Sequence, residues 1–209
     1  MAFIHISDEV LQVLAAKDAR LGKIIREIGK VKRQGTDDVF EGIIISIVSQ
    51  QLSAKAADTI FDRLAAIVGE VNPANIYKTD IMKIKSAGLS LRKAEYIKGI
   101  AEAILFGGFD IEGLHHKSDK EAIEEITKLK GLGVWSAEML LIFSFNRPDI
   151  LSFNDLGIQK GLEYLYYDME YDFEQIKKKF SPHCSVLSLY LWEIASRGRD
   201  WVKEILSKN

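Results

Sequence analysis

Two glycines one residue apart, Gly131 and Gly133, separate two stretches whose apolar residues recur at helical spacing. Because glycine has no Cβ, such a pair permits a tight turn whose backbone lies close to a neighbour. The first amides of the following helix have no intrahelical partner and can bind an anion such as a phosphate. An ordinary turn between two antiparallel helices is the alternative for this motif taken alone.

A carboxylate, Asp155, follows Gly133 by 22 residues. It precedes another segment with helical spacing of apolar residues, and either Asn154 or Asp155 would serve as the N-cap of that helix. A capping role and a chemical role are compatible, because the capping side chain remains a carboxylate. The segment from residue 129 to residue 161 therefore carries a candidate anion site and a candidate acid–base group.

The charge of the chain is close to balanced. Its 209 residues are 47% hydrophobic and 28% charged, with a formal net charge of −2. This composition can form a real core, but it gives no global attraction to a polyanion, so nucleic-acid binding would need a local basic surface or backbone amides. Six basic residues against two acidic ones lie between residues 78 and 98. They are either a solvated helical face or a phosphate-binding surface.

The apolar positions recur mostly at steps of three and four residues, and strand-like alternation is nearly absent. We predict an all-α protein of about ten helices joined by short loops. Residues Ser118 to Glu121 spell a capping box at the start of one helix. A helix–turn–helix pattern around Gly88 echoes the one around Gly133, 45 residues later, although coincidence of common turn chemistry is the alternative.

Several classes of protein are excluded. The single cysteine, Cys184, rules out an internal disulfide framework, an all-cysteine zinc site and a four-cysteine iron–sulfur cluster. His115 and His116 lack a third ligand at metal spacing, so we expect no catalytic metal. There is no signal-peptide pattern and no apolar run of about 20 residues, so we expect no membrane contact and no secretion. The expected location is the cytoplasm, in association with the nucleoid, or the nucleus.

Four blocks in order resemble the helix–hairpin–helix, glycine/proline-rich, aspartate (HhH-GPD) superfamily of DNA glycosylases. They cover residues 40–57, 88–97, 129–138 and 153–161, and a softer match continues to about residue 197. Within the superfamily they are most similar to the DNA-3-methyladenine glycosylase II group, the AlkA-like and Mag-like enzymes. The resemblance implies a two-lobed helical fold with the active-site cleft between the lobes.

This resemblance also implies a domain organisation. One lobe would cover about residues 37–117, and the other about residues 118–209 with the N-terminal segment 1–36. The helix–hairpin–helix itself would cover about residues 118–146. AlkA-like enzymes carry an additional N-terminal α/β domain, for which this chain has no room before Asp37. We therefore expect the compact all-helical form, as a monomer.

The resemblance assigns the catalytic role to Asp155, as the carboxylate that stabilises the oxocarbenium-like state of the sugar. Bifunctional glycosylase/lyases of the superfamily place a nucleophilic lysine two residues after the second hairpin glycine, where this chain has Trp135. An indole cannot form the Schiff base that strand cleavage requires. Trp135 is either a platform for a cationic base or a core tryptophan packed under the hairpin.

Further site residues follow from the same resemblance. Met139, one turn after Trp135, Phe40 and His183 are expected in the substrate pocket. The superfamily often has an aromatic residue and an arginine where this chain has His183 and Cys184. The residues expected to bind DNA lie in the hairpin, in the basic segment and at the end of an apolar helix, and they are Gly131, Gly133, Lys128, Lys130, Gln50, Gln51, Leu52, Lys85, Gly88, Arg92 and Lys93.

Gln50, Gln51 and Leu52 would supply the side chain that fills the gap left by an extruded nucleotide, with a plain polar helix end as the alternative. We expect no cofactor, apart from a monovalent cation bound by the hairpin carbonyls when DNA is present.

The implied activity is hydrolysis of the N-glycosidic bond of alkylated purines such as 3-methyladenine, after base flipping in double-stranded DNA. This is the reaction of a monofunctional DNA glycosylase of base excision repair. Two alternatives stay open. The chain could be a non-catalytic helix–hairpin–helix protein that binds damaged DNA, or a glycosylase/lyase acting on oxidised bases.

Overall fold

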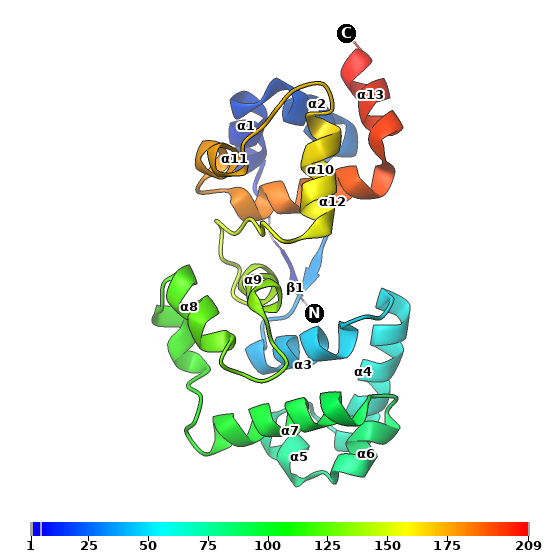
Figure 1. Cartoon of the computed structure of the whole chain (residues 1–209), viewed down its shortest axis with the longest axis vertical. Helices are drawn as coiled ribbons and strands as arrows, with labels where there is room; N and C mark the ends of the chain where they lie inside the picture. Colours follow the sequence, from blue (N-terminus) through cyan, green and yellow to red (C-terminus); the bar gives the residue numbers. More distant parts are fainter. Residues whose placement is uncertain (1, 5, 209) are drawn as a thin grey trace. The chain divides into compact units, whose positions relative to one another are not determined.

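The computed structural model describes residues 2–4 and 6–208. Within these residues it has thirteen α-helices, one 3-10 helix and a single pair of two-residue strands (Figure 1). The predicted all-α class is confirmed. The helices outnumber the expected ten partly because Asp18 divides the first helical stretch in two. No helix of the described residues is both long and apolar enough to span a bilayer.

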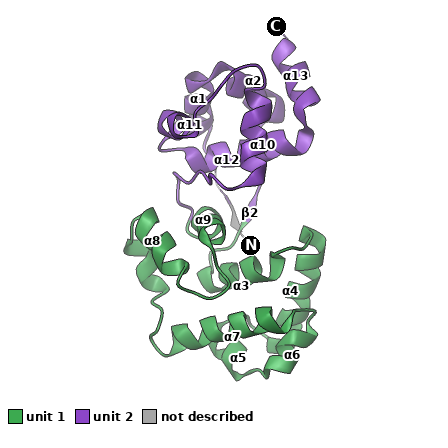
Figure 2. Ribbon diagram, in the orientation of Figure 1, with its two compact units in different colours: residues 1, 35–145 green, residues 2–34, 146–209 purple. Residues whose placement is uncertain are grey.

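The described residues form two compact units, one of residues 35–145 and one of residues 2–4, 6–34 and 146–208 (Figure 2). The first, unit 1, contains α3 (Val39–Ser49), α4 (Ala54–Val68), α5 (Pro73–Lys78), α6 (Ile81–Ser86), α7 (Leu91–Leu105), the 3-10 helix Glu112–His116, α8 (Asp119–Ile126) and α9 (Val134–Phe143).

Helix α3 forms the centre of unit 1. Its nearly continuous apolar sequence buries Ile43, Ile44, Ile47 and Val48, and it packs against α4, α7 and α9. Helices α5 and α6 pack on α7, and α8 packs on α9 (Figure 1). The sequence places the end of the first lobe near residue 117, whereas the structure places it at residue 145. The reason is that α9, with α8 beside it, packs on α3 within the same unit.

Unit 2 contains β1 (Ala2–Phe3), α1 (Asp8–Lys17), α2 (Ala19–Ile28), α10 (Leu156–Leu165), α11 (Phe173–Phe180), α12 (Cys184–Arg197) and α13 (Arg199–Ser207). Strand β1 pairs with β2 (Gln34–Gly35), beside a bond of 2.9 Å from the Ile4 amide to the Arg33 carbonyl. Helix α10 packs closely on the largely buried α12. A Cβ added at Gly161 would lie 2.8 Å from the backbone carbonyl carbon of Leu191, so glycine permits this approach.

Candidate active site

The turn between α8 and α9 is tied to two other helices of unit 1. Gly131 has a φ of +98°, which favours glycine, and a Cβ there would lie 2.8 Å from Cγ of the Tyr96 ring on α7. The side-chain amide of Gln50, at the end of α3, donates a hydrogen bond of 2.7 Å to the Gly131 carbonyl oxygen. The hairpin is therefore held in place by α3 and α7.

The second hairpin glycine has a different environment. Gly133 is exposed, its φ is −105°, and a Cβ added to it would meet nothing within 4 Å. As the N-cap residue of α9, it offers no side-chain acceptor to the amides of the first turn. At the echo of this motif, the Ser90 hydroxyl caps α7 by accepting from the Lys93 amide. Neither the backbone conformation nor the neighbouring atoms of the fold therefore require glycine at position 133.

In unit 2, Asp155 is the N-cap of α10 and is only 7% exposed. Its Oδ1 accepts from the backbone amide of Ile158 over 2.8 Å, which is the predicted capping bond. The same oxygen accepts from the indole Nε1 of Trp192, on α12, over 2.9 Å. The carboxylate is thus buried and anchored from two helices.

Comparison with known proteins gives a matching family model over residues 44–184, described as HhH-GPD superfamily base excision DNA repair protein. The chain belongs to the HhH-GPD superfamily. DNA-3-methyladenine glycosylase 1 of Schizosaccharomyces pombe is 33% identical to it over 197 residues, covering 90% of this chain and 86% of the relative.

Two solved structures of 3-methyladenine glycosylases are similar to this chain along most of its length. The DNA-3-methyladenine glycosidase of Bacillus halodurans has a TM-score of 0.84 and 33% identity, with both chains covered completely. The 3-methyladenine DNA glycosylase Mag1 of Schizosaccharomyces pombe, solved in complex with abasic DNA, has a TM-score of 0.73 and 30% identity, covering 88% of this chain and 95% of its own.

The residues predicted for the HhH-GPD substrate pocket lie in both units. Trp135, on α9, is 43% exposed, so it is not the core tryptophan of the alternative interpretation. Met139 is half-buried on the same helix, and Phe40 on α3 is 4% exposed. His183 is half-buried at the start of α12 in unit 2. The adjacent Cys184 is fully buried, and this burial raises the pKa of its thiol.

The segment predicted to fill the gap in DNA begins where α3 ends. The side chain of Gln50 is bound to the hairpin, whereas Gln51 and Leu52 are exposed. Gln51 has a φ of +61°, a left-handed conformation that few non-glycine residues adopt. The structure therefore separates Gln50, which is bound to the hairpin, from Gln51 and Leu52, which are exposed.

The predicted DNA-binding lysines and arginine differ in what they contact. Lys93 is half-buried, and its Nζ donates to the carbonyl oxygens of Val48 over 2.9 Å and Gln50 over 2.7 Å, at the C-terminal end of α3. Burial lowers the pKa of Lys93. Its ammonium thus stabilises the C-terminal end of α3, a contact that was not predicted from the sequence.

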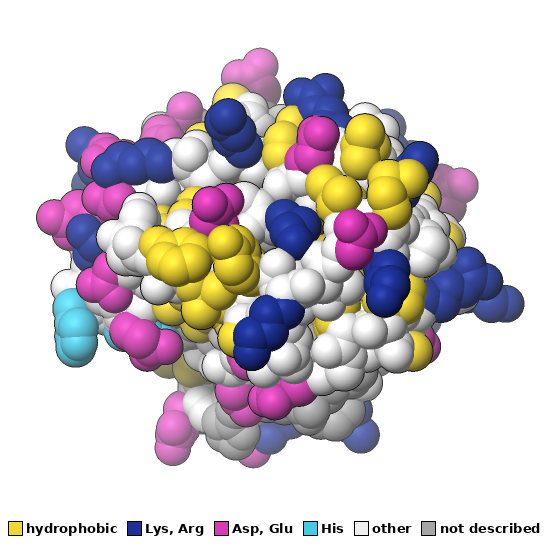
Figure 3. All heavy atoms as spheres, turned by 90° about the horizontal axis from the view of Figure 1, so that it is seen from below, with side chains coloured by type: hydrophobic (Ala, Val, Ile, Leu, Met, Phe, Trp, Pro, Cys, Tyr) yellow, Lys and Arg dark blue, Asp and Glu magenta, His cyan; other side chains and the backbone are white. Residues whose placement is uncertain are grey.

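The remaining residues of this set are exposed on unit 1. Lys85, Gly88 and Lys130 are exposed, Lys128 forms an ion pair of 2.9 Å with Glu125, and Arg92 donates to the Tyr96 hydroxyl. In Figure 3, which shows the α5–α7 end of unit 1, basic side chains alternate with acidic and hydrophobic ones. This face is therefore not a continuous basic patch.

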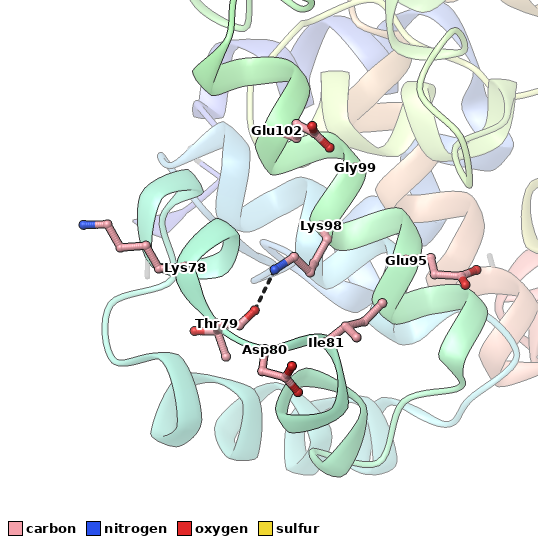
Figure 4. Close-up of a pocket in the computed structure, with 8 residues that line it drawn as sticks. All are labelled: Lys78, Thr79, Asp80, Ile81, Glu95, Lys98, Gly99 and Glu102. Carbon is pink, nitrogen blue, oxygen red and sulfur yellow. Dashed lines mark hydrogen bonds between the residues drawn. The ribbon is translucent and has the colours of Figure 1, made fainter.

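A hollow of about 570 Å³ on unit 1 lies apart from the predicted site residues (Figure 4). Charged side chains of both signs line it, and Lys98 donates to the carbonyl oxygens of Tyr77 and Thr79 over 2.8 and 2.7 Å. The Lys98 ammonium thus caps the C-terminal end of α5. Among the described residues, no three His, Cys, Asp or Glu side chains are placed to hold a metal ion.

The contact of Trp192 with Asp155 and the bond from Gln50 to the hairpin were not predicted from the sequence. A signal for Trp192 was present in the spacing of Gly157 and Gly161, which puts two residues without side chains one turn apart on α10. Such a pair indicates close approach by a second helix, but it does not identify the residue that approaches.

Proposed function

We propose that this protein is a monofunctional DNA-3-methyladenine glycosylase, which hydrolyses the N-glycosidic bond of alkylated purines in double-stranded DNA. The observation that carries the proposal is the buried Asp155 carboxylate, anchored at the start of α10 in a chain of the HhH-GPD superfamily. The names of the relatives support the choice of 3-methyladenine as the representative base.

The chemistry assigned to Asp155 is electrostatic. Departure of the base develops positive charge on the deoxyribose, and a fixed carboxylate close to the sugar stabilises that charge. An N-alkylated purine is cationic and is already a good leaving group, so the reaction demands little more. The largest unfavourable free-energy change is then the extrusion of the damaged nucleotide, which costs a few kcal/mol and less where base pairing is weakened.

The hairpin is the proposed contact with the DNA backbone. Gly133 is unexplained by the fold, and a phosphate approaching the first-turn amides of α9 supplies the missing reason. Backbone amides bind phosphate without a positive side chain, which agrees with the net charge of −2. The family implies that the hairpin carbonyls hold a monovalent cation when DNA is bound. Carbonyl oxygens suit such an ion, although that of Gly131 already accepts from Gln50.

Trp135 is proposed to contact the cationic base. Its indole on α9 is exposed, and a cation–π contact between an indole face and a charged base is worth about 0.5 to 2 kcal/mol. It also occupies the position where a lyase of the superfamily has its nucleophilic lysine. We therefore infer base release without strand cleavage.

A base-release assay on alkylated, deaminated and oxidised duplexes tests the proposal. The protein is expected to release free 3-methyladenine, to leave the strand intact until alkali is added, and to form no covalent DNA adduct in the presence of borohydride. Binding to abasic-site duplex without release of any base would identify a non-catalytic damage-binding protein. A borohydride-trapped adduct would identify a glycosylase/lyase.

A further inference from the structure

The Asp155 carboxylate is held by a side chain of α12 in addition to its own helix. Asp38 and Asp172 cap α3 and α11 through the same kind of backbone bond but are exposed. Asp18, which caps α2, is also buried, but its further donors include the charged ammonium of Lys179. Asp155 is buried and also accepts the indole N–H of Trp192. A helix cap needs only the backbone bond, so the indole contact requires a separate explanation.

We propose that Trp192 and Gly157 are positioning residues for the Asp155 carboxylate, an inference that rests on the proposed function. Both donors, the Ile158 amide and the Trp192 indole, meet the same oxygen, Oδ1. Two hydrogen bonds from different helices to one oxygen fix the rotation of the carboxylate about its Cβ–Cγ bond. Both of its oxygens then have defined places relative to α10.

Gly157 makes this contact possible. A Cβ at this position would lie 2.6 Å from Cδ1 and 3.1 Å from Nε1 of Trp192, and 3.1 Å from Oδ1 of Asp155. Any other residue would therefore occupy the space in which the indole meets the carboxylate. Gly161, one turn later, lies against the backbone of Leu191, so the two glycines together bring α12 close enough for Trp192 to reach Asp155.

The choice of an indole donor suits the proposed chemistry. Trp Nε1–H is a neutral donor, whereas Lys or Arg would bring a full positive charge beside the carboxylate. An indole orients Asp155 and leaves its negative charge available for the sugar cation. Such fixed orientation is valuable because electrostatic stabilisation depends on groups that need no rearrangement during the reaction.

The first test compares Trp192→Phe with wild type, using Trp201→Phe on α13 as the matched control. Single-turnover release of 3-methyladenine is expected to fall roughly ten- to hundredfold in Trp192→Phe, the range for losing a hydrogen bond to a charged group. Affinity for abasic-site duplex should stay within about twofold of wild type, because DNA contacts are unchanged. Equal losses of rate and affinity, or an unchanged rate, would overturn the positioning role.

A second variant avoids removal of the large side chain. Gly157→Ala inserts one methyl group between Trp192 and Asp155 and should lower the release rate with little effect on affinity. Gly99→Ala, on α7, places a methyl group where no atom lies within 4 Å and should leave the rate unchanged. If Gly157→Ala is as active as Gly99→Ala, the proposal fails.

A spectroscopic readout is independent of activity. The chain has three tryptophans, so Trp192→Phe identifies the Trp192 indole resonance in a nitrogen–proton NMR spectrum. That resonance should move upfield in Asp155→Asn, whose neutral oxygen is a weaker acceptor, while the Trp201 resonance stays in place. An unmoved Trp192 resonance contradicts the contact. Absence of base release by wild type would instead overturn the proposed function, so the two failures are distinguishable.

Discussion

The side-chain amide of Gln50 donates to the backbone carbonyl of Gly131 over 2.7 Å and so joins the end of α3 to the hairpin before α9. Lys93 donates to the Gln50 carbonyl over 2.7 Å, which ties the same point to α7. The segment proposed to enter the DNA gap and the turn proposed to hold a phosphate are therefore parts of one connected structure in unit 1.

Loss of the Gln50 side chain should loosen this connection. Gln50→Ala is expected to lower the free energy of unfolding by about 0.5 to 1.5 kcal/mol and to weaken binding to abasic-site duplex about three- to tenfold. Urea denaturation and fluorescence anisotropy would measure the two effects. Gln12→Ala, at an exposed position of α1, is the control and should change neither. Unchanged affinity in Gln50→Ala would show that DNA binding does not depend on the bond to the hairpin.

The two hairpin glycines should respond differently to alanine. Gly131→Ala forces a side chain into the left-handed region, at a cost of about 1 to 2 kcal/mol, and places it against the Tyr96 ring. Its melting temperature should fall. Gly133→Ala meets no atom of the protein and should keep its stability within about 0.5 kcal/mol, yet lose about tenfold in affinity for duplex DNA because a methyl group obstructs the phosphate. If Gly133→Ala is stable and binds duplex DNA as tightly as wild type, this turn does not bind a phosphate.

Trp135 should matter most for charged bases. Trp135→Ala is expected to slow release of cationic alkylpurines roughly two- to thirtyfold, the equivalent of one cation–π contact. Release of a neutral base such as hypoxanthine, where measurable, should fall less. Trp201→Ala serves as the comparison on α13. Equal losses on charged and neutral bases would mean that Trp135 contributes packing and not a cation–π contact.

A pH-dependent part of the stability should arise from Asp18, the residue between α1 and α2. Burial alone would raise the pKa of this carboxyl. The hydrogen bonds from Lys179 Nζ, the Leu21 amide and the Tyr166 hydroxyl lower the pKa by more than burial raises it, so it lies below its ordinary value of 3.8. A group with a lowered folded-state pKa stabilises the protein above its unfolded pKa and loses that contribution as pH falls through the folded pKa.

Urea midpoints measured from pH 7 down to pH 3 test this assignment. Asp18→Asn should be about 1 to 3 kcal/mol less stable than wild type at pH 7 and should lose less stability on acidification. Asp8→Asn removes an exposed ion pair with Lys30 and should cost less than about 1 kcal/mol. Parallel acid profiles for wild type and Asp18→Asn would contradict the role of Asp18.

Local signals explain which parts were predictable from the sequence. The capping box of Ser118 and Glu121 is present as predicted, with the Ser118 amide donating to Glu121 over 2.9 Å, because both partners lie within one turn. The position of Asp155 as a helix cap was predictable for the same reason. Helical periodicity gave the fold class, since each helix buries its own apolar face.

Contacts between distant residues were not predictable in this way. Trp192 and Asp155 are 37 positions apart, and Gln50 and Gly131 are 81 apart. Periodicity indicates which face of a helix is buried but not which residue faces it. The unit boundary at residue 145 and the hydrogen bond from Lys93 to a carbonyl of α3 were not predicted for the same reason. Both depend on packing between separate helices.

If the negative charge of Asp155 stabilises the sugar cation, Asp155→Asn should release 3-methyladenine far more slowly than wild type. Asparagine keeps a side-chain oxygen that can accept from Ile158 and Trp192, so the helix cap should persist while the negative charge is lost. We expect a single-turnover rate at least about a hundredfold below wild type, with unchanged melting temperature and retained binding to abasic-site duplex. Release at the wild-type rate would contradict this role of Asp155.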